Sequence, residues 1–181
     1  MIKKISLVLL IVAQLAVPAS LMGSNERVLN NGMAYKFKTA PVDPYDIFRG
    51  RYVAINIEQR EAPLSVEDTE KLSKAKWNGY AIIGVGEDGY AFVERLVSEK
   101  PERENYFRTK IYSYASSGET GFFIFPIDRF YMNEHKAPKA EELYRKNMQG
   151  QRNAYMLVRV LNGKMVIEDL IVDEKPIASY F

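Results

Sequence analysis

The sequence predicts a β-rich α+β protein: a single antiparallel β domain, sandwich or barrel-like, with two minor helices and an apolar helix before it. Three observations lead to this fold class. Aromatic residues make up 12% of the chain, and tyrosine and phenylalanine favour strands. Several short segments alternate apolar and polar residues, as half-buried strands do. Two pairs of such segments flank the turns Glu87-Asp88-Gly89 and Asn162-Gly163, which are typical of β-hairpins.

The length and charge of the chain limit its class. Its 181 residues suffice for one domain and a short appendage. Two of its 25 basic residues, Lys3 and Lys4, precede an apolar N-terminal run, which leaves 23 basic against 23 acidic residues for the rest. A neutral domain argues against nucleic acid as a partner, because that partner requires a basic excess on one face.

The chain contains no cysteine and one histidine, His135. This composition excludes disulfides, thiolate zinc sites, cysteine nucleophiles and a histidine-rich metal site within one chain. We therefore expect no metal and no cofactor. A serine–lysine hydrolase would need neither residue type, but no serine lies in a recognisable nucleophile context.

Residues 1–23 have the regions of a secretory signal: two lysines, an apolar run, and the small residues around Pro18 and Ala19. As a helix, residues 5–22 would be roughly 27 Å long, against about 30 Å for a hydrocarbon core. Proline has no N–H to donate, so we expect a helix to kink or end at Pro18. A cleaved signal peptide and an uncleaved membrane anchor both remain open. Either places residues 24–181 outside the cytoplasm, membrane-bound on the periplasmic side or, after cleavage, secreted or periplasmic.

The first half of the domain contains strands and one helix. A polar connection covers residues 24–32, and alternation predicts strands at 33–39 and 52–57. A charged loop over 58–63 leads to a short peripheral helix over 65–76. Ser65 and Asp68 resemble a capping box at its start.

The second half is predicted to be mostly strand. Strands are expected at 79–86, 90–98 and 106–114, a turn at 116–121, and a strand buried on both faces at 122–125. A helix over 138–148 precedes a hairpin formed by residues 154–161 and 164–172. An extended tail ends the chain.

The segment 39–57, TAPVDPYDIFRGRYVAINI, combines the most backbone constraint with the most charge. Prolines 41 and 44 restrict the turn, and glycine favours a bulge or a positive φ before the strand. We take its polar residues and its glycine as a candidate binding motif: Asp43, Asp46, Arg49, Gly50, Arg51 and Tyr52.

This segment resembles the defining block of the GDYXXLXY family, whose motif corresponds here to GRYVAINI (50–57). Arg51 stands where the motif has Asp, Ile55 where it has Leu, and Ile57 where it has the second Tyr. The resemblance implies a bacterial exported or membrane-anchored protein with no established activity and a multi-pass membrane protein as partner. A second block, DRFYMNE (128–134), also resembles the family, and its candidate residues are Asp128, Arg129, Tyr131 and Glu134.

Two functions are compatible with the first block. The aspartates can cap a turn that fixes strand register, in an accessory module that binds a membrane-protein partner without catalysis. Alternatively Asp43 or Asp46 serves an extracytoplasmic hydrolase, although Arg51 removes the carboxylate for which the motif is named. We favour the binding module and assign no catalytic residue.

Overall fold

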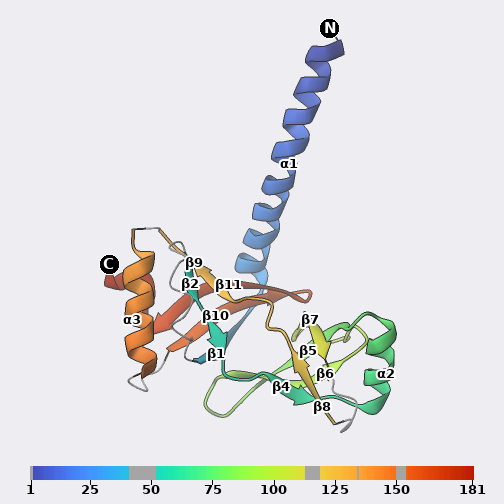
Figure 1. The fold of residues 1–181 in the computed structure, drawn as a ribbon, viewed down its shortest axis with the longest axis vertical. Coiled ribbons are helices and arrows are strands. Elements are labelled where there is room, and N and C mark those ends of the chain that lie inside the picture. Colours follow the sequence, from blue (N-terminus) through green and yellow to red (C-terminus); the bar gives the residue numbers. More distant parts are fainter. Residues whose placement is uncertain (1, 41–51, 113–118, 134, 150–153) are drawn as a thin grey trace.

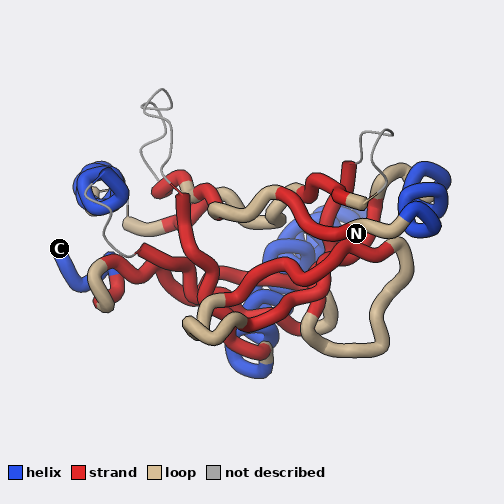
Figure 2. The backbone as a smooth tube through the Cα atoms, turned by 90° about the horizontal axis from the view of Figure 1, so that it is seen from below, coloured by secondary structure: helices blue, strands red, loops and turns tan. Residues whose placement is uncertain are grey.

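The computed structural model describes residues 2–40, 52–112, 119–133, 135–149 and 154–181. Within them lie two five-stranded antiparallel sheets, a two-stranded ribbon and three α-helices: α1 (Ile2–Asn31), α2 (Val66–Lys74) and α3 (Ala137–Gln149). Helix α1 rises away from the sheets, while α3 and α2 lie at opposite ends of the domain (Figures 1 and 2). The β-rich α+β class is confirmed, and the described strands form no closed barrel.

The first sheet pairs strands from the N-terminal part of the chain with strands from the C-terminal part. Its order is β12 (Lys175–Pro176), β11 (Lys164–Val172), β10 (Ala154–Leu161), β1 (Met33–Ala40) and β3 (Asn56–Ile57). The central hairpin has the predicted bounds, and its turn residues Asn162 and Gly163 have φ values of 51° and 78°. Two consecutive positive φ values are what a type I′ turn requires. A 3₁₀ turn at Ile177–Tyr180 follows β12, where we had expected an extended tail.

The second sheet comes from one continuous part of the chain. Its order is β4 (Glu61–Pro63), β8 (Thr120–Phe123), β7 (Tyr106–Tyr112), β5 (Asn78–Val85) and β6 (Ala91–Val97). Helix α2 begins as predicted, because Ser65 Oγ accepts a hydrogen bond from the Asp68 N–H at 3.1 Å. Its residue Leu72 is fully buried.

A short ribbon pairs β2 (Tyr52–Ala54) with β9 (Arg129–Tyr131). The predicted strand at 52–57 is therefore divided between two sheets. Ile55 lies at the division, where its N–H donates to the Asp128 carbonyl at 2.9 Å before β3 pairs with β1. The inward face predicted for the segment 52–57 is confirmed, since Val53, Ile55 and Ile57 are all buried.

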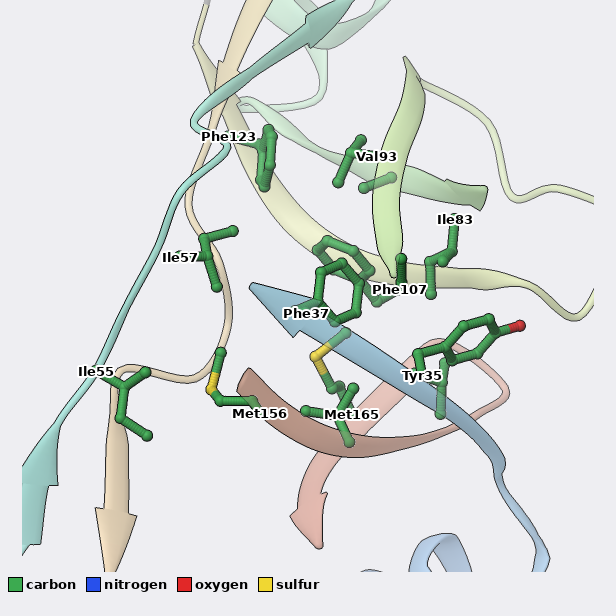
Figure 3. Packing of buried hydrophobic residues seen from close by; sticks show 14 of the residues in the cluster. Tyr35, Phe37, Ile55, Ile57, Ile83, Val93, Phe107, Phe123, Met156 and Met165 are labelled. Atoms are coloured by element: carbon green, nitrogen blue, oxygen red, sulfur yellow. The ribbon is translucent and has the colours of Figure 1, made fainter. Parts of the chain in front are cut away.

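One hydrophobic core fills the space between the sheets. Phe37 of β1 and Phe107 of β7 face each other across it (Figure 3). Phe125 contacts both rings edge-on, with centroids 5.1 Å from Phe37 and 5.5 Å from Phe107. The tip of the β10–β11 hairpin also reaches the second sheet, where Arg108 N–H donates to the Gly163 carbonyl at 3.0 Å. The sheets therefore share a single core.

Several local expectations were wrong. Residues 24–31 continue helix α1 instead of forming a connection, and the helix does not end at Pro18, which lies inside it. Residues 61–63 form β4, because they pair with the edge of β8. Residues 122–125 were expected to be buried on both faces, but they alternate: Phe123 is buried whereas Phe122 and Ile124 are exposed.

The exposure of the apolar side chains of helix α1 changes along its length. Large apolar side chains from Leu10 to Met22 are exposed, whereas Val28 is buried against the β10–β11 hairpin. Among the helices in the described part of the chain, none combines the length and the hydropathy needed to cross a bilayer.

Candidate functional site

The structure brings the two candidate blocks side by side. Tyr52 pairs with Tyr131, and Ala54 pairs with Arg129, although about 75 positions separate them in the sequence. The three-residue length of β9 hides its alternation, so sequence periodicity alone gives no signal for this pairing. We name strands β2 and β9 together the β2–β9 ribbon.

The described side chains of the second block lie at the surface. Tyr131 is 67% exposed, and the side chain of Asp128 is 71% exposed. Arg129 Nε lies 3.4 Å from the Asp128 carboxylate, so the two charges are paired. Phe130, which lies between Arg129 and Tyr131 in the sequence, packs against the core and holds the ribbon in place.

The rest of the first block is only partly visible. Asp43, Asp46, Arg49, Gly50 and Arg51 lie outside the described residues, as does Glu134 of the second block. Their proposed roles stay predictions. The second half of the motif is visible, because Ile55 and Ile57 occupy the Leu and second Tyr positions. Both side chains lie in the core, so this half of the motif stabilises the fold.

A buried polar contact holds the chain where it enters the first block. Thr39 Oγ1 donates to the Ala154 carbonyl at 2.9 Å, and Tyr144 of α3 donates from its hydroxyl to the Ala40 carbonyl at 3.2 Å. Burial raises the pKa of Tyr144 to about 12, while a hydrogen bond with Thr39 acts in the opposite direction. In the sequence, Tyr144 is only one residue of the helix expected over 138–148. Only its position beside Ala40 reveals the polar role.

A groove of about 310 Å³ lies between β1 and the β5–β6 turn. Lys38 and Asp88 form an ion pair of 2.8 Å on its wall, and the ammonium group also lies 4.7 Å from the centre of the Tyr90 ring. The hydrogen bond between them raises the pKa of Lys38 and lowers that of Asp88. The charges of Lys38 and Asp88 are therefore already satisfied by each other.

A second groove, of about 450 Å³, lies where α1 meets the sheets. Arg27 of α1, Arg108 of β7 and Lys164 of β11 line it, and no acidic residue of the described chain does. We call it the helix-base groove. No sequence motif marks it, because its three cations come from three distant segments.

The described residues contain no cluster of three or more carboxylate or histidine side chains suited to hold a metal ion. The side chains of Tyr131 and Asp128 are exposed, as the side chains of a contact region are before a partner binds.

The comparison with protein families is consistent with both blocks. The family described as GDYXXLXY protein matches residues 14–170, which is most of the chain, and the chain belongs to this family. No curated protein and no solved structure gives a significant match.

Proposed function

We propose that this chain is a non-enzymatic binding module outside the cytoplasm, associated with the membrane through its N-terminal segment. Its partner would be a membrane protein. The observation that carries the proposal is the contrast within α1. The side chains of its apolar part are exposed and not covered by the domain, while its last turns pack against the first sheet.

The exposed part of α1 requires an apolar environment. The exposed large side chains of the described helix are Leu10, Ile11, Val12, Leu15, Val17, Leu21 and Met22. At about 100° per residue they spread around the helix, so no single face could be covered by packing against this domain. Each such side chain gains roughly 1.5–3 kcal/mol when it leaves water. A membrane, or the export machinery that reads signal peptides, supplies that environment.

The β2–β9 ribbon is the proposed contact for the partner. Exposed aromatic and paired charged side chains are common in protein interfaces, and Tyr131 and Arg129 provide both types. The nature of the partner, a multi-pass membrane protein, is suggested by the family resemblance. The docked end of α1 would keep the ribbon at a constant distance from the membrane.

Affinity purification of the tagged full chain from its native membranes tests the partner. We expect a membrane protein to copurify, and Tyr131→Thr to reduce its yield by about tenfold, as loss of an interface anchor does. Tyr112→Thr is the matched control, because Tyr112 is also an exposed strand tyrosine but lies on the second sheet. Equal capture by both variants would place the contact elsewhere.

Turnover assays address the hydrolase alternative. If Asp43→Asn or Asp46→Asn abolished a measured hydrolysis while the partner still copurified, the binding proposal would be wrong.

Protease protection in intact and permeabilised cells tests the compartment. We expect the domain to be digested once the outer permeability barrier is opened while the inner membrane stays sealed. The mass of the mature N-terminus distinguishes a cleaved signal peptide from a retained segment. Protection until the cytoplasm is opened would contradict export.

A further inference from the structure

The helix-base groove combines three cations from separate parts of the chain. Arg27 lies on α1, Arg108 on β7, and Lys164 beside the tip of the β10–β11 hairpin. The hairpin tip brings them together, since the Gly163 carbonyl accepts a hydrogen bond from the Arg108 N–H at 3.0 Å. Lys164 Nζ also donates to Ser24 Oγ at 2.8 Å, which fixes the base of the helix against the hairpin.

These three charges lack a counterion within the described chain. None of the three makes an ion pair with a carboxylate of the described residues. Other exposed bases do form ion pairs, such as Lys38 with Asp88 and Arg159 with Glu168. Three unpaired cations around one concave surface produce a positive potential that attracts an anion.

The groove extends along the second sheet. A neighbouring groove of about 430 Å³ shares Arg108 and Pro126 with it and adds Lys110. Among the residues that the structure describes, no acidic side chain lines this second groove. The basic surface is therefore continuous from the base of α1 to the middle of β7.

The groove lies at the level where lipid headgroups would be. The exposed apolar run ends at Met22, and Arg27 follows five residues later. At 1.5 Å per residue this is roughly 7.5 Å along the helix axis. A bilayer of about 40–45 Å with a core of about 30 Å leaves roughly 5–8 Å for each headgroup layer. If the apolar run ends at the edge of the hydrocarbon, Arg27 lies among the phosphates.

We propose that the helix-base groove binds the headgroup of an anionic phospholipid. The phosphate lies against Arg27, Arg108 and Lys164, and the acyl chains lie along the exposed apolar side chains of α1. The proposal rests on the proposed association of α1 with the membrane. It adds a ligand class, and it implies that lipid binding orients the domain relative to the bilayer.

Vesicle flotation with the full chain tests this inference. One set of vesicles contains phosphatidylcholine alone, and the other contains one part phosphatidylglycerol to three parts phosphatidylcholine. A groove variant carries Arg27→Gln, Arg108→Gln and Lys164→Gln. A control variant carries Lys74→Gln, Lys100→Gln and Lys139→Gln, three exposed residues that line neither basic groove and change the net charge equally.

We expect the groove variant to lose affinity for the anionic vesicles by roughly fivefold per charge, or on the order of 100-fold in total, at low salt. The loss of affinity in the control variant should be smaller by a factor of at least about ten. Binding to neutral vesicles should not change in either variant. Thermal unfolding of both variants verifies that they fold.

Other results overturn the inference and can be told apart. Equal losses in the two variants would mean that diffuse charge and not the groove attracts the lipid. No loss in either variant would mean that the groove binds no headgroup. If the unmodified chain bound neither vesicle type, or if Leu15→Asn with Leu21→Asn left neutral-vesicle binding unchanged, the membrane role of α1 would itself fail.

Discussion

The two five-stranded sheets are built from the sequence in different ways. The second sheet, β4-β8-β7-β5-β6, uses one continuous part of the chain, from residue 61 to residue 123. The first sheet, β12-β11-β10-β1-β3, closes only when the C-terminal hairpin returns to β1, so that Met33 pairs with Val160. Local pairing costs less loop-closure entropy than pairing across more than 120 residues.

The candidate functional surfaces lie mostly in the region built by long-range pairing. The first block leaves from β1 and returns through β2 and β3, and α1 docks on the β10–β11 hairpin. The β2–β9 ribbon likewise joins distant segments. The second sheet contributes Arg108 and the other half of the core. It therefore acts as a support whose contact with the first sheet fixes the positions of the candidate surfaces.

The largest expected effect comes from removing the side chain that joins both halves of the core. Phe107→Ala should lower the free energy of unfolding by about 3–5 kcal/mol, because Phe107 is fully buried between Phe123 and Phe125. Chemical denaturation measures the change. Phe92→Ala is the control, since Phe92 is 43% exposed on the edge strand β6 and should cost far less. Similar costs would mean that the two sheets do not depend on a shared core.

A smaller effect is expected where the hairpin tip touches the second sheet. Gly163 has φ +78°, and a Cβ there would lie 2.6 Å from Tyr106 Cε2. Gly163→Ala should therefore cost roughly 2–3 kcal/mol, from backbone strain and from displacement of the tip.

Gly89→Ala is the matched control for this substitution. Gly89 has a similar φ of +75°, but its Cβ would meet nothing within 4 Å. The cost of this control should be about 1 kcal/mol, from the backbone alone. If both substitutions lowered the free energy of unfolding equally, the contact between the hairpin tip and the second sheet would not contribute to stability.

At neutral pH the smallest effect is expected at Tyr144, because its consequence for stability develops only in alkaline solution. Burial raises the pKa of Tyr144 from its ordinary 10.0 to about 12, so the folded state holds this proton more tightly than the unfolded state. Stability from this group is fully present below pH 10 and is lost as the pH rises through 12. The loss amounts to roughly 2–3 kcal/mol at the end of that interval.

Tyr144→Phe should make stability decline less steeply between pH 10 and 12, as measured by denaturation at a series of pH values. Tyr112→Phe, at an exposed tyrosine, should leave the slope unchanged. A slope that is the same in both variants would mean that the Tyr144 hydroxyl is not held near Ala40.

The sequence by itself determined the local elements whose signals are short-range. The Asn162-Gly163 turn needs two positive φ values and so predicts its hairpin. The Ser65 cap predicts the start of α2. Alternation also predicted that Val53, Ile55 and Ile57 share a buried face. The family was recognisable because GRYVAINI keeps the spacing of its motif despite Arg51.

Only the tertiary structure decided which distant segments meet. Residues 61–63 read as a charged loop, yet they form β4 because β8 offers a free edge. The pairing of Tyr52 with Tyr131 follows from the way Ile55 bonds to Asp128, which no local pattern records. The same holds for Arg27, Arg108 and Lys164. Each reads as an ordinary surface base in the sequence, and only the docking of α1 and the hairpin tip places them around one groove.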